Sequence, residues 1–149
     1  MSVPKSLDLD LSQLTDLNLL RQLGRIFKEL HVRGICRTDS FVAEIGEWWA
    51  KRSLGLDLMP PVTPGYDAVK NGVKYEIKTR RIYKGARTQR STRRVPGLAG
   101  VYDILLLVIL DEFFQCREIH EIPKASIGDE KEATVAKLLS NSSSKRVWP

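Results

Sequence analysis

Apolar residues recur at every third or fourth position in two stretches of the first third of the chain. This spacing predicts two amphipathic helices, one over residues 11–31 and one over residues 40–53. Gly34 suits the end of the first helix, and Thr38, Asp39 or Ser40 suits the N-cap of the second. The apolar stripes consist of Leu14, Leu17, Leu20, Leu23, Ile26, Phe27 and Leu30 in the first helix, and Phe41, Val42, Ile45, Trp48 and Trp49 in the second.

The period changes to two after a proline-rich connection over residues 59–65. Asn71-Gly72 lies between alternating apolar residues, which is the signature of a two-residue type I′ turn. With this turn, Val69 pairs with Lys74, and Asp67 faces Glu76. Residues 65–78 therefore form a predicted β-hairpin around which the rest of the chain is organised.

Beyond the hairpin, residues 78–100 contain several glycines and a proline and are expected to be mostly loop. The continuous apolar run 104–110 predicts a strand covered on both faces, and 113–122 an adjacent strand. We expect a short helix over 129–139 and a mobile tail over 140–149. The chain thus reads as a single α/β domain, residues 1–149.

Composition places the chain among soluble globular proteins. It has 149 residues, of which 42% are hydrophobic and 28% charged. It shows neither an apolar run long enough for a bilayer nor the pattern of a secretory signal, so a cytoplasmic location is expected. Two cysteines, Cys36 and Cys116, are too few for a disulfide framework or a zinc site.

The positive charge is concentrated in one segment. Eight of the 24 basic residues fall between Lys78 and Arg94 with no acid among them, while the other 16 are outnumbered by 18 acids. A cluster of one sign is the footprint expected where phosphates are neutralised, although a non-specific role or an anionic protein partner stays open. The predicted nucleic-acid contacts are Arg80, Arg81, Lys84, Arg87, Arg90, Arg93 and Arg94.

The hairpin itself carries the candidate chemistry. Opposed side chains on paired strands have Cβ atoms roughly 4.5–5.5 Å apart, so Asp67 and Glu76 would repel each other unless a divalent cation lay between them. Lys78 follows two residues later on the same face and could reach a phosphate. The alternative is a solvated charged strand face.

A third carboxylate precedes the hairpin. Glu44 and Glu47 lie three residues apart on the second predicted helix, and so share one of its faces. Either could complete a metal site, and both could be ordinary surface glutamates.

Together, these residues resemble the PD-(D/E)XK restriction-endonuclease-like superfamily. The resemblance rests on Asp67, Glu76-Ile77-Lys78 and the preceding helical glutamate, and it covers residues 38–122. Gly46-Glu47-Trp48-Trp49-Ala50 is similar to the Gly-Glu-x-x-Ala pattern of some bacterial members, which favours Glu47 over Glu44. A tyrosine, Tyr66, stands where the motif has proline.

The resemblance implies a restriction-endonuclease-like core, a central mixed β-sheet flanked by helices, and Mg²⁺- or Mn²⁺-dependent hydrolysis of DNA phosphodiester bonds. Asp67, Glu76, the carbonyl of Ile77 and a helical glutamate would hold the metal, and Lys78 would orient water or stabilise negative charge. A catalytically silent or partner-dependent binding module and an RNA-directed nuclease are the alternatives. Cleaving both strands would call for a homodimer.

Overall fold

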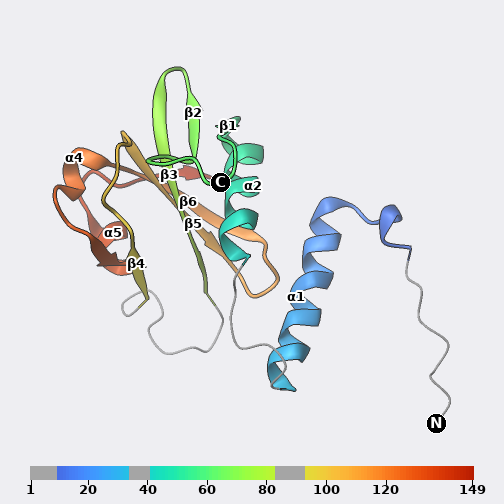
Figure 1. Cartoon of the computed structure of the whole chain (residues 1–149). Coiled ribbons are helices and arrows are strands. Elements are labelled where there is room, and N and C mark those ends of the chain that lie inside the picture. Colours follow the sequence, from blue (N-terminus) through green and yellow to red (C-terminus); the bar gives the residue numbers. More distant parts are fainter. Residues whose placement is uncertain (1–9, 34–40, 83–92) are drawn as a thin grey trace, which may run out of the picture.

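A six-stranded mixed β-sheet forms the centre of the computed structural model, which describes residues 10–33, 41–82 and 93–149. The strand order is β1-β2-β3-β5-β6-β8; β3 (Val73–Arg81) and β5 (Ile104–Leu110) run parallel, and the other neighbours are antiparallel. Helices lie on both sides of the sheet (Figure 1). The predicted α/β class, with a central mixed sheet flanked by helices, is therefore confirmed.

The remaining elements either complete this sheet or lie beside it. They are η1 (Leu11–Gln13), α1 (Asp16–Val32), α2 (Val42–Leu54), β1 (Asp57–Leu58), β2 (Ala68–Lys70), β4 (Arg94–Pro96), β6 (Cys116–Pro123), α4 (Lys124–Ile127), β7 (Glu132–Thr134), α5 (Val135–Ser140) and β8 (Lys145–Trp148).

The hairpin has the predicted register. Ala68 pairs with Tyr75, Val69 with Lys74 and Lys70 with Val73. Asn71 and Gly72 have φ angles of 50° and 78°, as a type I′ turn requires. Because β2 is short, it pairs only with the beginning of β3. Among the described residues, no strand pairs with that side of β3 beyond Tyr75, so the rest of this edge is open.

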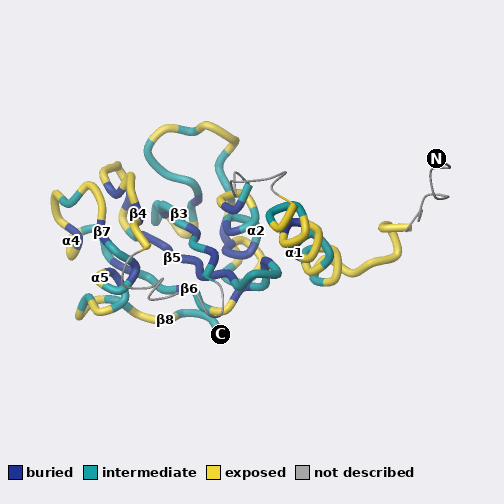
Figure 2. The backbone as a smooth tube through the Cα atoms, turned by 90° about the horizontal axis from the view of Figure 1, so that it is seen from below, coloured by how far each residue is buried: buried dark blue, intermediate teal, exposed yellow. Residues whose placement is uncertain are grey.

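The strand β5 is the core of the molecule, as its apolar run predicted. Leu105 to Leu110 are all at most 2% exposed, and the tube in Figure 2 is dark blue along this strand. Leu106 and Val108 pack with α1 and α2 on one face. Leu105 and Leu107 pack on the other face, with β4, β7 and α5.

The two predicted helices form with shifted starts. Residues 11–13 are a 3-10 turn, and α1 begins at Asp16 because the Thr15 hydroxyl accepts a hydrogen bond from Asn18 N. The helix α2 begins at Val42, and the proposed cap residues 38–40, like Gly34, lie outside the described residues. None of the described helices is long and apolar enough to cross a lipid bilayer.

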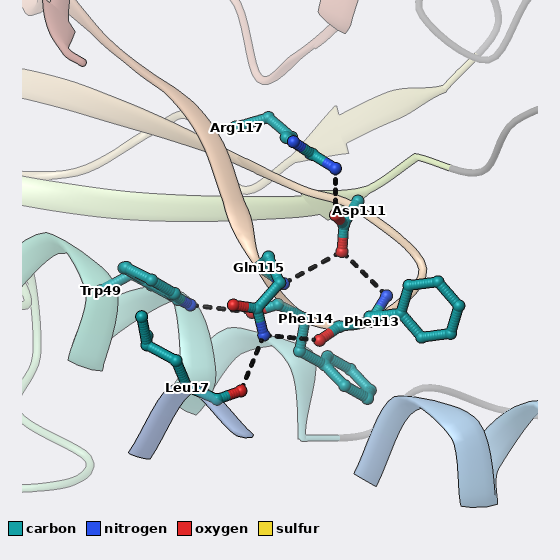
Figure 3. Close-up of polar contacts among 7 residues, drawn as sticks. All are labelled: Leu17, Trp49, Asp111, Phe113, Phe114, Gln115 and Arg117. Carbon is teal, nitrogen blue, oxygen red and sulfur yellow. Dashed lines mark hydrogen bonds and ion pairs between the residues drawn. The ribbon is translucent and has the colours of Figure 1, made fainter. Parts of the chain in front are cut away.

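One turn after β5 fastens both helices to the sheet (Figure 3). The Asp111 carboxylate accepts from the amides of Phe113 and Gln115, at 2.8 and 3.0 Å. The Phe114 carbonyl accepts from Trp49 Nε1 of α2 at 2.8 Å, and Gln115 Nε2 donates to the Leu17 carbonyl of α1 at 3.2 Å. The position of α2 over the sheet is thereby fixed.

Two predictions for the C-terminal third are wrong. Residues 129–139 are not one helix, because residues 132–134 pair with β4 as the strand β7 before α5 begins. Nor is 140–149 a mobile tail, because β8 pairs with β6 and joins the sheet. Trp148 packs on Trp49, with ring centroids 5.8 Å apart, and this apolar contact holds the end of the chain in place.

Candidate active site

A cavity of about 380 Å³ lies at the open edge of β3. Its lining residues come from one helix, from the residue just before β2 and from two strands. Three of its residues are acidic and three are basic. The lining is Val42, Ala43 and Glu47 of α2, Asp67 before β2, Glu76, Ile77, Lys78, Thr79 and Arg80 of β3, and Arg93 and Pro96 at β4.

The backbone of the hairpin places Asp67. Its amide donates to the Tyr75 carbonyl, and its Oδ2 accepts from the Ile77 amide, both at 2.8 Å. The carboxylate thus occupies the first free position on the open edge of β3. Because a residue's N–H and C=O point to the same side of a strand, the Ile77 carbonyl lies on this edge as well.

Glu76 and Lys78 form an ion pair on the cavity wall. Lys78 Nζ lies 2.6 Å from Glu76 Oε1, and both side chains are largely buried. Burial raises the pKa of Glu76 above its usual 4.5, Lys78 opposes this shift, and the charge of Asp67 adds to it. The charge of Asp67 therefore acts on Glu76, as the predicted register required.

Glu47, rather than Glu44, lines this cavity. Glu44 instead borders a separate hollow with Asp16 and Trp48, between α1 and α2. Burial raises the pKa of Glu47 above 4.5, and the neighbouring carboxylates, Asp67 first, raise it further. The cavity is therefore lined by three carboxylates that repel one another, those of Glu47, Asp67 and Glu76.

Arg80 and Arg93 form a basic part of the same wall. The Arg80 guanidinium is fixed by main-chain carbonyls: Nε donates to Arg94 O at 2.8 Å, and Nη1 donates to Thr79 O at 2.5 Å. Burial lowers the pKa of Arg80, and the like charge of Arg93 lowers it further. Arg93 itself is exposed, and two cations next to each other, one of them fixed and partly buried, suit an anionic ligand.

The other predicted phosphate contacts have different surroundings. Arg81 is only 2% exposed, with its guanidinium 4.2 Å from the centroid of the Phe114 ring, so the prediction that it grips phosphate is wrong. Arg81 points to the opposite face of β3 from Arg80, since strand side chains alternate. Arg94 is exposed and paired with Glu132. Lys84, Arg87 and Arg90 lie outside the described residues.

Some residues at the site were not singled out by their sequence, among them Pro96 and Gly97. Pro96 lines the cavity, and Gly97 has φ of 68° with the Lys78 ammonium beside it. A β-carbon on Gly97 would lie 3.2 Å from Lys78 Nζ. The Pro-Gly pair in the sequence indicates a turn, but only the tertiary structure brings that turn to Lys78.

The acidic side of the cavity has the oxygen donors that Mg²⁺ and Mn²⁺ prefer. In the described part of the chain, no group of three or more His, Cys, Asp or Glu side chains is arranged so that it could hold a metal ion. Asp67 is engaged by the Ile77 amide and Glu76 by Lys78. The donor set suits a hard cation, which would compete with the Lys78 ammonium for Glu76.

A comparison with protein-family models finds no family that matches this chain. A comparison with curated proteins likewise finds no similar sequence.

Proposed function

We propose that this protein is a metal-dependent endonuclease that hydrolyses DNA phosphodiester bonds. One observation carries the proposal: residues 47, 67, 76 and 78, from three separate segments, line one cavity together with Arg80 and Arg93. A folded protein gains nothing from gathering three carboxylates in one cavity, where burial and neighbouring negative charge raise the pKa of Glu47 and of Glu76, so a ligand that relieves the repulsion is the simplest reason for the arrangement.

The proposed fold is a restriction-endonuclease-like core. It is supported by the hairpin that carries Asp67 and Glu76, by β5 running parallel to β3, and by α2 lying beside the site with Glu47. In this proposal Asp67, Glu76, the Ile77 carbonyl and Glu47 would hold Mg²⁺ or Mn²⁺. Such an ion polarises a phosphoryl oxygen and lowers the pKa of a bound water.

The other residues act directly on the substrate. Lys78, once released from Glu76, places its ammonium group toward the phosphate and stabilises the negative charge that develops there. Arg80, held by two carbonyls, and Arg93 bind phosphate oxygens through charge-assisted hydrogen bonds. Contacts of this kind position a strand without reading its sequence, and they weaken as salt increases.

The second candidate is a nucleic-acid-binding module that cuts only with a partner or not at all. The pairing of Lys78 with Glu76 favours it, because this site satisfies its own charges as it stands. Both candidates share the basic residues of the wall. They differ in whether a divalent cation displaces Lys78.

The test is cleavage of labelled DNA and RNA by the full chain with Mg²⁺, Mn²⁺ or EDTA. We expect metal-dependent cleavage of DNA, and a loss of roughly 100-fold or more in Asp67→Asn and in Lys78→Met, with DNA binding largely retained. Glu47→Gln should behave similarly. Glu44→Gln is the matched control, since Glu44 lies on the same helix but borders another hollow.

Each alternative has its own outcome. Undiminished cleavage by the Asp67→Asn/Lys78→Met double variant would refute the proposed site. DNA binding without cleavage, and without thermal stabilisation by Mn²⁺, would favour the binding module, while preferred cleavage of RNA would reassign the substrate. For cleavage of both strands we also propose a homodimer, which sedimentation of the full chain tests.

A further inference from the structure

Val62 adopts a backbone conformation that valine rarely takes. Residues 60–63 form a tight turn, in which the Pro60 carbonyl accepts from Thr63 N at 3.2 Å and from Thr63 Oγ1 at 2.6 Å. Val62 is the third residue of this turn and has φ of 66°. A proline in the second place and a positive φ in the third correspond to a type II turn, whose third residue is normally Gly or Asn.

The side chain of Val62 gains nothing from the fold in return. It is 97% exposed, the highest value among the exposed large apolar residues of the described chain. A β-branched residue at positive φ is strained, since its branches crowd the backbone. Burial of the Val62 side chain therefore does not compensate for the strain in its backbone. Residues with strained backbone conformations are concentrated at functional sites.

The turn stands directly beside the proposed active site. Met59 to Thr63 and Tyr66 border a hollow of about 90 Å³ whose remaining lining residues are Glu47 and Asp67. The same two carboxylates line the main cavity. Three prolines in the loop, Pro60, Pro61 and Pro64, fix φ at their positions and limit how far the turn can move. Val62 is thus an exposed apolar group on a stiff loop at the acidic rim.

We propose that Val62 contacts the substrate, packing its isopropyl group against the sugar or base of a nucleotide next to the phosphate bound in the cavity. This inference rests on the proposed function. Apolar side chains inserted beside bases are a common means of unstacking or bending DNA near a binding site. The arginines of the cavity wall bind phosphate and supply no such contact.

The experiment replaces Val62 with Asn and with Gly, both of which tolerate the positive φ without the branched side chain. Each variant should raise the melting temperature by about 2–8 °C through relief of strain. Each should also lower kcat/KM for DNA cleavage by ~10-fold, the scale of one lost apolar contact. Val32→Asn is the control, since Val32 is 76% exposed but lies at the end of α1, away from the cavity.

Substrates with one abasic nucleotide at successive positions around the cut identify the contact. At the position that Val62 touches, removing the base should slow the wild type and leave little further loss in Val62→Asn. Wild-type cleavage in Val62→Asn at every position would overturn this inference and leave the proposed function standing. A wild-type chain that neither binds nor cleaves nucleic acid would overturn both.

Discussion

Replacing Gly46 by alanine would disturb the contact that holds α2, and with it Glu47, against β3. A β-carbon on Gly46 would lie 1.7 Å from Thr79 Oγ1 and 2.6 Å from both Thr79 Cβ and Cγ2. Thr79 is only 5% exposed and points from β3 toward α2, so it has little room to turn away. The helix must therefore move off the strand in Gly46→Ala.

The expected magnitude follows from two opposing effects. Overpacking a well-packed core costs about 1–3 kcal/mol, and overlap this severe belongs at the upper end of that range. Alanine returns about 1 kcal/mol through its higher helix propensity. The net loss is about 2 kcal/mol in the free energy of unfolding, or roughly 4–8 °C in melting temperature for a chain of this size.

Chemical denaturation of the two single variants and the double variant measures this contact. Thr79→Ala removes Oγ1 and Cγ2, two of the three crowding atoms, so it should recover about 1 kcal/mol or more of the loss in the Gly46→Ala background. Lys51→Ala, on the exposed side of α2, controls for general effects on the helix. This account of α2 packing would be refuted if Gly46→Ala were as stable as the wild type. It would also be refuted if the free-energy changes of Gly46→Ala and Thr79→Ala simply added up in the double variant.

Three further outcomes are expected. The pKa of Glu47 is raised above 4.5 in the folded state, so its ionisation lowers the stability of the fold as the pH rises from 4.5 through the raised pKa. Glu47→Gln should therefore raise the melting temperature at pH 7 but not near pH 4. Arg81→Met should lower stability with little effect on DNA affinity, whereas Arg93→Met should weaken binding and reduce its salt dependence, as fluorescence anisotropy would show. Deleting residues 145–149 should lower the melting temperature measured by circular dichroism, because it removes β8 and the Trp148 contact.

The elements predicted correctly are those whose signals are local. Asn71-Gly72 fixes a turn within two residues, and the unbroken apolar run of β5 allows little else but a strand buried on both faces. The errors lie where distant partners decide. Residues 132–134 are too few to predict a strand by themselves and become β7 because β4 pairs with them. The serines among residues 140–144, just before β8, give no hint that β6 leaves an edge for that strand.

The candidate site also combines features that follow from the local sequence with features that depend on distant partners. Alternation along β3 placed Glu76 and Lys78 on one face, and the ion pair between them agrees with it. The same alternation should have set Arg81 apart from Arg80, but the density of positive charge along the sequence gave no sign that Phe114 would bury one of the two. Charge counts along a chain say nothing about which face a side chain occupies.

The sequence alone determined the α/β class, the hairpin register and the place of Asp67 and Glu76 on that hairpin, because each depends on periodicity or on neighbours a few positions away. The tertiary structure decided the rest. Packing of α2 on β3 brought Glu47 to the cavity and left Glu44 outside it, and β4 brought Arg93 and Pro96 to the same cavity. Residues far apart in sequence meet only where the core has positioned their elements, so the cavity is a property of the packed chain.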